Sequence, residues 1–269
     1  MLVKNILIIS SKKYTKLKTY TELLDLIEDL DISYKTIYIE DNDDDYVTHL
    51  TSESLIVSFG GDGTALKAMK TSWNNDLLFM PLGTGRVGYL VNQSDDIENV
   101  LKSWMVDNND IVKRSAVIQN SDKDLPAFNE VVIIKNSPTR ILDAVFQTHD
   151  QTVKLRADGI IISTSLGSTA YNYSAGGPIV QNSLESIIIT PISPFSKFPR
   201  SIVLDGDSKI EITVKKNQNY AIQFDGVVES EVLSDKDNTF VYTLSTKTLN
   251  IIGTENSPRL DLFLNQILR

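Results

Sequence analysis

The chain has 269 residues, of which 41% are apolar and 23% are charged, and it carries a formal net charge of −9. This length suits a large core in two domains, and the composition is ordinary for a globular protein. The negative charge argues against a dedicated nucleic-acid binder, which needs clustered Lys and Arg, but it leaves room for a small anionic ligand. The absence of cysteine excludes disulfides and thiolate metal sites and fits a reducing compartment. Because the apolar start is too short to span a membrane and lysines follow it, we expect a cytoplasmic protein.

The first 105 residues alternate between strand and helix patterns. Apolar, β-branched runs predict strands over 3–10, 34–39, 55–59 and 77–82. Apolar residues at helical spacing predict helices over 14–30, 65–71 and 97–105. This alternation predicts a mostly parallel sheet with helices on its faces, and such sheets bind ligands at the carboxyl ends of their strands.

From about residue 110 the pattern changes to short β-rich runs separated by Asp-Gly, Pro or Asn turns. The predicted strands are 116–119, 130–134, 144–148, 152–155, 159–163, 186–189, 201–204, 209–214, 220–224 and 248–252. A helix is predicted over 258–268. The predicted fold class is therefore α/β plus all-β, with an N-terminal α/β domain over 1–107, a β-rich domain over 108–245, and a tail over 246–269 that returns to the first domain.

A glycine-rich turn, Gly60-Gly61-Asp62-Gly63-Thr64, lies between a predicted strand and a predicted helix. Glycines at this place allow a tight turn and leave backbone N–H groups open to an anion. Asp62 would repel phosphate unless it accepts a proton from a hydroxyl or a divalent cation lies between them. The alternative is a plain glycine turn in which Asp62 is exposed or caps the helix.

Two further segments offer binding groups. The run 83–88 matches G-x-G-x-x-G after a strand, but no helix follows at once, so it is either a second glycine loop over the same ligand or a structural turn. The stretch 158–178 is rich in hydroxyl groups and glycine, which suits ribose hydroxyls and amides; the alternative is an edge turn of the β domain. Asn129-Glu130 precedes an apolar run and, on local sequence alone, is a strand cap.

Several chemistries are disfavoured. The sequence has no G-x-x-x-x-G-K-[ST] loop and no protein-kinase signature set. Its two histidines, His49 and His149, stand in no motif, which disfavours a His-based zinc site and a Ser-His-Asp hydrolase. The acidic run 40–45 lacks the spacing of a calcium loop and is expected to be a solvated loop, although a metal site is the alternative.

In their order along the chain these segments resemble the NAD kinase family over residues 54–230. The turn at Gly60–Thr64 matches the family's GGDGT loop, which diacylglycerol and sphingosine kinases share. The run 83–90 is similar to its second glycine loop, and Asn129-Glu130 matches its Asn-Glu pair. The stretch 156–178, with Thr-Ala-Tyr and Ser-Ala-Gly-Gly-Pro, is similar to the long and specific family signature, and 189–194 to its Thr-Pro segment.

The resemblance implies a two-domain fold that holds NAD between an α/β and a β domain. It implies ATP or polyphosphate as phosphoryl donor, a divalent metal such as Mg²⁺, and a homo-oligomer, a dimer or tetramer, with no nucleic-acid or membrane partner. Asp62 would be the catalytic base toward the adenosine-ribose 2′-hydroxyl. The expected NAD contacts are Asp62, Gly63, Asn129, Glu130, Arg140, Arg156, Asp158, Thr169, Ala170, Tyr171, Asn172 and Ser174. The expected phosphate-donor contacts are Gly60, Gly61, Gly63, Thr64, Lys67, Gly83 and Gly85.

The chain departs from the family pattern at three places. Gly83 stands where Asn is usual, the run 163–167 replaces Ser-Thr-Pro-Thr-Gly, and Val227 follows a later Asp-Gly where Gln is frequent. These differences leave the donor preference open. Two other functions stay open as well: a lipid kinase that shares the GGDGT loop, against which the hydroxyl-rich 158–178 stretch argues, and a non-catalytic dinucleotide sensor, against which Asp62 argues.

Overall fold

A computed structural model describes residues 3–41, 50–84, 90–91, 111–119, 125–149, 151–195 and 200–252. The chain forms two compact units, of which unit 1 comprises residues 1–114 and 248–269 and unit 2 comprises residues 115–247. The predicted helices over 97–105 and 258–268 lie outside the described residues. No helix in the described part of the chain is long and apolar enough to cross a membrane.

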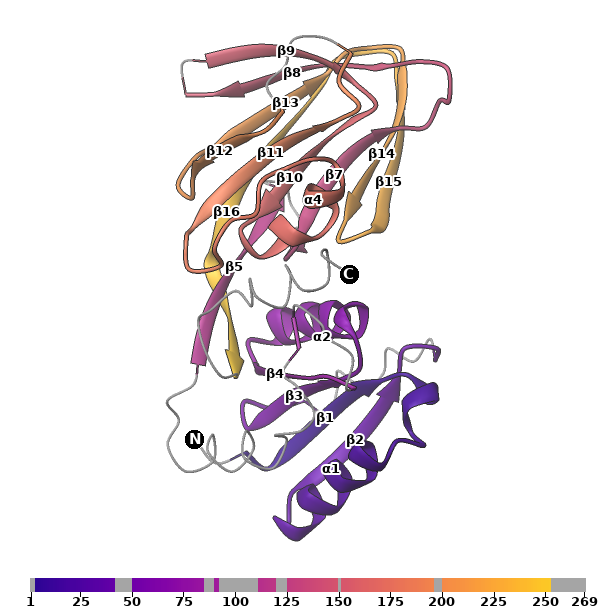
Figure 1. Cartoon of the computed structure of the whole chain (residues 1–269), viewed down its shortest axis with the longest axis vertical. Coiled ribbons are helices and arrows are strands. Elements are labelled where there is room, and N and C mark those ends of the chain that lie inside the picture. The colour runs from indigo at the N-terminus through magenta and orange to yellow at the C-terminus, as the bar shows by residue number, and fades with distance from the viewer. Residues whose placement is uncertain are drawn as a thin grey trace. The chain divides into compact units, whose positions relative to one another are not determined.

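Unit 1 is built on a parallel sheet in the order β2-β1-β3-β4, beside which the end of β16 is added (Figure 1). Its elements are β1 (Asn5–Ser10), a 3-10 helix η1 (Lys12–Tyr14), α1 (Lys18–Asp29), β2 (Ser33–Tyr38), β3 (Ser54–Phe59), α2 (Asp62–Asn75) and β4 (Leu78–Leu82). β1 pairs in parallel register with both β2 and β3. The short parallel contact of β16 with β4 joins Ile251 to Phe79, so the end of β16 belongs to this unit.

The helices of unit 1 form where apolar side chains recur at helical spacing. α1 buries Tyr20, Leu23 and Ile27, which lie three and four residues apart and therefore share one face of the helix. These side chains pack with apolar residues of β1 and β3 in one core cluster. α2 begins within the glycine turn, at Asp62, and ends at Asn75. The next residue, Asp76, has a left-handed conformation (φ 55°) that closes the helix.

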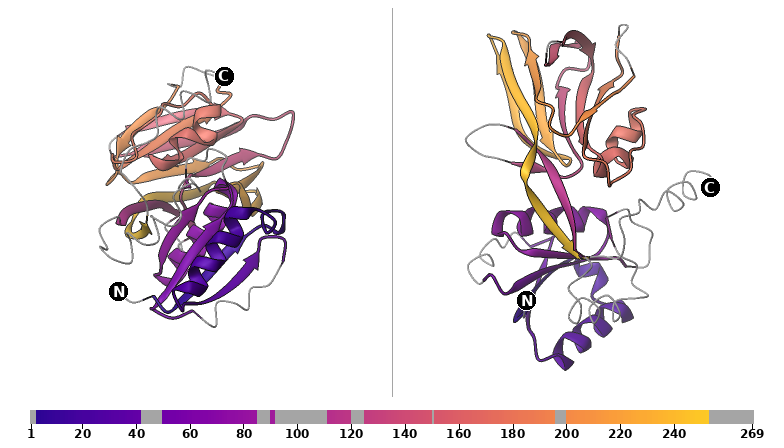
Figure 2. Two further views of the ribbon diagram at one scale, coloured as in Figure 1. Left: turned by 60° about the horizontal axis from the view of Figure 1, so that its bottom comes forward. Right: turned by 90° about the vertical axis from the view of Figure 1, so that its left-hand side faces the viewer.

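Unit 2 contains two sheets, which Figure 2 shows as two layers. One is six-stranded and antiparallel in the order β12-β11-β10-β7-β14-β15; the other contains β16, β13, β8 and β9 in that order, with β5 and β6 at its margin. The strands are β5 (Ile111–Gln119), β6 (Pro126–Ala127), β7 (Glu130–Lys135), β8 (Leu142–Thr148), β9 (Gln151–Ala157), β10 (Gly159–Thr164), β11 (Ser186–Ile192), β12 (Ile202–Asp205), β13 (Ile210–Val214), β14 (Gln218–Phe224), β15 (Val227–Ser234) and β16 (Asn238–Ile252).

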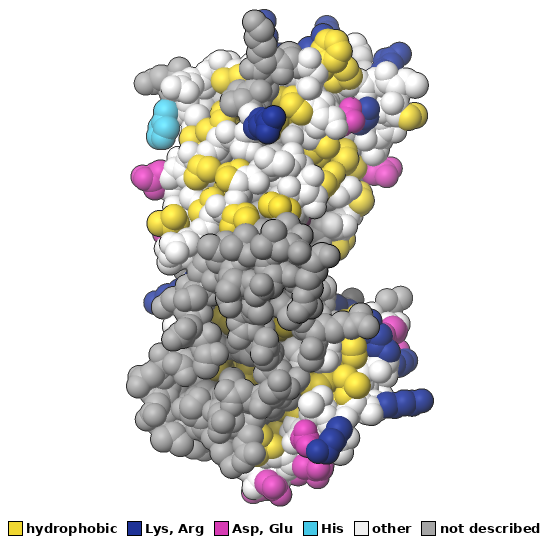
Figure 3. Space-filling model, viewed as in Figure 1, with side chains coloured by type: hydrophobic (Ala, Val, Ile, Leu, Met, Phe, Trp, Pro, Cys, Tyr) yellow, Lys and Arg dark blue, Asp and Glu magenta, His cyan; other side chains and the backbone are white. Residues whose placement is uncertain are grey.

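The core of unit 2 comes from inward-facing residues of these strands. Alternate residues of β8, such as Leu142, Ala144 and Phe146, are buried and cluster with β10 and β13 side chains. Apolar side chains also reach the surface of this unit at several separate spots (Figure 3). The exposed apolar residues of this unit include Val203 on β12 and Leu233 on β15, the two edge strands of the six-stranded sheet.

Candidate functional site

The glycine turn of unit 1 joins the carboxyl end of β3 to the first residue of α2. Gly60 donates its N–H to the carbonyl of Leu82 at 3.0 Å, which ties the turn to the end of the neighbouring strand β4. Gly61 caps α2, and its carbonyl accepts the N–H groups of Thr64 and Ala65. The turn therefore stands at the carboxyl edge of the parallel sheet, where the strand–helix alternation predicts a ligand site.

The glycines of this turn differ in what the fold requires of them. A Cβ on Gly60 would lie 2.6 Å from the Thr64 hydroxyl oxygen, so buried Thr64 demands a glycine there. A Cβ on Gly61 or on Gly63 would meet nothing within 4 Å. Neither of these two glycines has a positive φ. Neither packing nor backbone conformation thus requires glycine at positions 61 and 63. A ligand that approaches the backbone closely would require glycine at both positions.

Asp62 is half-buried at the start of α2 and connects the two glycine loops. Its Oδ1 accepts the N–H of Leu90 at 3.1 Å, so the chain that leaves β4 comes back to the first loop. Within the second loop Gly83 is buried and Thr84 is half-buried, and Gly85 lies outside the described residues. Lys67 is half-buried on α2, where it carries a positive charge five residues after Asp62.

A second group of predicted residues gathers at one end of the six-stranded sheet in unit 2. Ser163 near the end of β10 pairs with Glu130 at the start of β7, and Phe224 at the end of β14 pairs with Val131. The end of β10 leads into a 3-10 helix, η4 (Leu166–Thr169), and a short helix, α4 (Tyr171–Ser174). Asn129 and Glu130 are therefore neighbours in space of Ser163 and Thr164, which lie within the hydroxyl-rich stretch.

The backbone of Asn129 is held by the end of β10. Its carbonyl accepts the N–H of Thr164 at 3.0 Å and the hydroxyl of Ser163 at 3.1 Å. A Cβ on Gly167 would lie 2.1 Å from the same carbonyl oxygen, so η4 approaches this backbone as closely as only glycine permits. These contacts use the backbone of Asn129; among the described residues its side-chain amide has no hydrogen-bond partner.

Glu130 is a buried carboxyl group, one oxygen of which is unpaired in the part of the chain that the structure describes. It is 6% exposed, and its Oε2 has no hydrogen-bond partner among the described residues. Burial, reinforced by the charge of Asp225, raises the pKa of Glu130 to about 8, although the backbone N–H of Tyr171 acts in the opposite direction. A buried polar atom left unpaired costs free energy, and a carboxyl group with a strongly shifted pKa is typical of a functional site.

The residues after η4 differ in their accessibility. Thr169 and Ala170 are half-buried, whereas Tyr171 and Ser174 are exposed. Asn172 is fully buried: its amide nitrogen donates to the carbonyls of Ser168 and Pro178, and its oxygen accepts the Thr190 hydroxyl at 2.6 Å. These hydrogen bonds hold the loop together, and the expected contact of Asn172 with NAD stays a prediction.

Of the remaining predicted residues, Asp158 lies at the other end of the same sheet, whereas Arg156 belongs to β9 in the other sheet of unit 2. Asp158 precedes β10 and forms an ion pair of 2.5 Å with Lys135, the last residue of β7. Five residues of strand, roughly 17 Å, separate Asp158 from Ser163, the partner of Glu130. Arg140 is exposed in the loop that follows β7, and Arg156 is exposed on β9, where its guanidinium carbon lies 5.5 Å from the centre of the Phe195 ring.

Asp225 belongs to the Glu130 end of the sheet but is absent from the residues that the sequence singles out. Its carboxylate accepts three backbone N–H groups, those of Phe128, Asn129 and Glu130. The signal for Asp225 in the sequence is the Asp-Gly dipeptide, which predicts a hairpin turn. The dipeptide does not predict a contact with a segment 97 residues away.

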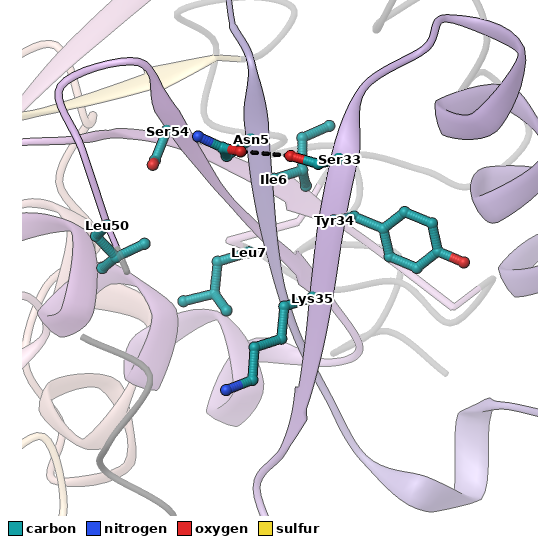
Figure 4. Close-up of a pocket in the computed structure, with 8 residues that line it drawn as sticks. All are labelled: Asn5, Ile6, Leu7, Ser33, Tyr34, Lys35, Leu50 and Ser54. Atoms are coloured by element: carbon teal, nitrogen blue, oxygen red, sulfur yellow. Dashed lines mark hydrogen bonds between the residues drawn. The ribbon is translucent and has the colours of Figure 1, made fainter. Parts of the chain in front are cut away.

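No group of three or more acidic or histidine side chains in the described part of the chain is arranged to hold a metal. A small pocket of about 140 Å³ lies elsewhere in unit 1, lined by residues from the first halves of β1, β2 and β3 and by Leu50 (Figure 4). Its lining includes Asn5 and Ser33, which are hydrogen-bonded to each other, and none of the predicted site residues. Because β1, β2 and β3 are parallel, the glycine turn stands at their opposite ends.

The sequence of the chain is similar to those of known proteins. A family model described as the ATP-NAD kinase C-terminal domain matches residues 128–252. The NAD kinase of Archaeoglobus fulgidus is 31% identical over 188 residues, which cover 68% of this chain and 75% of that protein. A bifunctional NADP phosphatase/NAD kinase of Methanocaldococcus jannaschii is 34% identical over 199 residues, 71% of this chain and 35% of that protein, so the chain spans about a third of that relative.

Among solved structures, an Archaeoglobus fulgidus NAD kinase in complex with ATP superposes with a TM-score of 0.78 at 24% identity, over 97% of this chain and 98% of that chain. This likeness confirms the predicted fold class, an N-terminal α/β domain with a C-terminal β domain. The chain belongs to the NAD kinase family.

Proposed function

We propose that the protein is an NAD kinase, which transfers a phosphoryl group from ATP to the adenosine-ribose 2′-hydroxyl of NAD and releases NADP and ADP. Unit 1 would supply the phosphate-donor loop and unit 2 the groups that bind NAD. Family membership supports this reaction, and the A. fulgidus relative in complex with ATP supports ATP as the donor.

One observation carries the proposal: a lone carboxylate stands between two glycines that the fold itself does not need. A Cβ would be tolerated at both Gly61 and Gly63, yet both positions lack one. Phosphate groups bind well to backbone N–H groups at the start of a helix, and side chains on these residues would obstruct that approach. Asp62 is the first residue of α2, so its carboxylate would lie close to a hydroxyl brought to such a phosphate.

The chemistry asks the protein mainly for positioning and charge stabilisation. Asp62 would accept the proton of the ribose 2′-hydroxyl as its oxygen bonds to the γ-phosphorus, while the bond from that phosphorus to the ADP oxygen breaks. Backbone N–H groups of the glycine turn and the ammonium group of Lys67 would stabilise the negative charge of the donor. Asn129 and the free oxygen of Glu130 would hold the adenosine part of NAD.

A divalent metal, such as Mg²⁺, fits this arrangement if it arrives with the nucleotide. Mg²⁺ in kinases is typically held by one or two carboxylates together with substrate phosphates, and it neutralises charge on those phosphates. Asp62 is the carboxylate that stands at the donor loop, so the described residues offer one protein ligand and leave the rest to ATP and water. This role and that of a proton acceptor are the two alternatives for Asp62.

Other properties rest on the family resemblance and on the composition of the sequence. We infer a homo-oligomer, a dimer or tetramer, in the cytoplasm, with NAD and ATP as its small-molecule partners and no nucleic-acid or membrane partner. Size-exclusion chromatography with light scattering measures the oligomeric state directly.

The test of the reaction is direct. Purified protein is incubated with NAD, ATP and Mg²⁺, and NADP is read with an NADP-specific dehydrogenase. Parallel reactions replace ATP with polyphosphate, NAD with NADH, and Mg²⁺ with a chelator. NADP formed with no donor present, or phosphorylation of a diacylglycerol in place of NAD, would contradict the proposal; binding of NAD without turnover under every condition would identify a sensor instead.

A further inference from the structure

A two-residue turn joins β14 to β15 and consists of Asp225 and Gly226. Both residues have positive φ, 50° and 78°, as in the tight hairpin turn that suits the twist of two antiparallel strands. Asn-Gly and Gly-Gly satisfy such a turn as well as Asp-Gly does. The turn therefore requires a residue that tolerates positive φ, but it does not require a carboxylate.

The carboxylate has a second use, on a segment far away in the sequence. Its Oδ1 accepts the N–H of Asn129 at 2.7 Å and that of Glu130 at 3.3 Å, and its Oδ2 accepts the N–H of Phe128 at 3.1 Å. The N–H of Asp225 in turn donates to the carbonyl of Glu130 at 3.0 Å. Consecutive backbone N–H groups that converge on one anion form a concave binding site, and here the chain's own carboxylate fills it.

We propose that Asp225 is a positioning residue, whose carboxylate fixes the backbone of Phe128–Glu130 so that the Asn129 amide and the free carboxyl oxygen of Glu130 are held toward NAD. The inference rests on the proposed function for its ligand. It assigns to the turn a role in substrate affinity beyond that of closing a hairpin.

The same carboxylate also acts on the protonation of Glu130. The groups that face Glu130 are Asp225 from the β14–β15 turn and the backbone N–H of Tyr171 from α4. Burial and the charge of Asp225 favour the neutral acid, and a neutral carboxyl group can donate a hydrogen bond that a carboxylate cannot. Glu130 would thus present its unpaired Oε2 as a donor to an acceptor atom of NAD.

Two variants remove the carboxylate and keep the hairpin: Asp225→Asn and Asp225→Gly, both of which tolerate positive φ. The matched control is Asp237→Asn. Asp237 also lies between two strands of unit 2 and accepts a backbone N–H, that of Lys216 at 2.9 Å, but it has no contact with the Phe128–Glu130 segment. Thermal unfolding of all three variants checks that the chain folds.

Three measurements follow. Both Asp225 variants should weaken NAD binding, measured by calorimetry without donor, and raise KM for NAD by about tenfold or more while KM for ATP changes little. Amide hydrogen exchange at Asn129 and Glu130 should accelerate. NAD affinity should fall as rising pH ionises Glu130. In Asp225→Asn this fall should begin at a lower pH than in the wild type, because the neutral amide no longer disfavours ionisation of Glu130.

The outcomes distinguish the positioning role of Asp225 from the NAD kinase reaction. NAD affinity and a pH profile like those of the wild type in both folded Asp225 variants would overturn the positioning role, as would an equal loss in Asp237→Asn. Should the wild type form no NADP, the proposed function fails, while the exchange and NAD-binding measurements still decide whether Asp225 holds this segment for the ligand.

Discussion

Individual side chains decide what the candidate site can do, and they were predictable to different degrees. Asp62 stands out in the sequence because a carboxylate within a glycine turn needs a chemical reason. Glu130 does not stand out, since a polar residue at the start of a strand is ordinarily a cap. Only the three-dimensional structure shows that Glu130 is buried, that one of its oxygens is unpaired, and that Asp225 lies beside it.

We expect Asp62→Asn to reduce turnover by about 10²- to 10⁴-fold, the usual cost of losing a general base. NAD binding should change little, because the amide fills the same volume and can still accept the N–H of Leu90. The measurement is kcat for NADP formation together with the dissociation constant of NAD. Turnover like that of the wild type in the folded variant would remove Asp62 from the mechanism. A defect that added Mg²⁺ corrects would favour the metal-binding role.

The pKa of Glu130 predicts how stability depends on pH. It is raised from 4.5 to about 8 in the folded chain, so the folded state retains a proton that the unfolded state loses. The resulting stabilisation is complete below pH 4.5 and disappears as pH rises toward 8, and it amounts to a few kcal/mol at most. Glu130→Gln removes this titration. Urea unfolding between pH 5 and 9 should therefore show wild-type stability falling relative to that of the Gln variant; parallel curves would mean that Glu130 ionises normally.

At the scale of elements, the turns and short helices carry the site and the strands place it. The periodicity of the sequence predicted the parallel strands of unit 1 and most strands of unit 2. It missed β15 and most of the 15-residue β16, because charged and polar residues interrupt their apolar pattern. It also missed that α2 begins already at Asp62, since Gly63 disfavours a helix in propensity alone.

Two glycine substitutions separate structural from functional glycines. In Gly167→Ala the new Cβ would lie 2.1 Å from the backbone oxygen of Asn129, so η4 or the start of β7 must shift. Such a clash typically costs about 1–3 kcal/mol or more. In Gly63→Ala the new Cβ meets nothing, and alanine is the better helix former, so stability should be unchanged or higher by up to about 1 kcal/mol.

The two substitutions should also differ in their effects on activity. Gly63→Ala should raise KM for ATP in a fully stable protein, because the methyl group occupies space that the donor phosphates need. Gly167→Ala should lower the melting temperature and impair NAD use together. Chemical unfolding and steady-state kinetics on both variants provide the comparison, and a Gly63→Ala enzyme with normal KM for ATP would show that this glycine does not face the donor.

At the scale of the whole molecule, the order of motifs along the chain predicted the family, and the patterns of strands and helices predicted the fold class. Neither could predict which motifs share one end of a sheet. That depends on strand pairing between segments distant in the sequence. β7 pairs with β10 and with β14, which brings Asn129-Glu130 to Asp225 and to Ser163 of the hydroxyl-rich stretch. The same pairing puts Asp158 at the far end, beside Lys135.

This separation sharpens the prediction for Asp158, for which the family resemblance implies a contact with the nicotinamide end of NAD. Roughly 17 Å of strand lies between Asp158 and the partner of Glu130, a distance that only an extended ligand could bridge. Asp158→Ala should therefore weaken NAD more than it weakens an adenosine-only analogue. It should also lower turnover, because remote binding energy helps to orient the reacting hydroxyl.

The control for that substitution is Lys135→Met, which removes the ion-pair partner of Asp158 and keeps the carboxylate. If Asp158 serves NAD, its own substitution should be the more damaging for NAD use, and the Lys135 variant should affect mainly stability. Equal losses with NAD and with the adenosine-only analogue, reproduced by Lys135→Met, would instead show that the ion pair is structural. Asp158 would then close the end of β10 and β7, and the nicotinamide end of NAD would be bound by other residues.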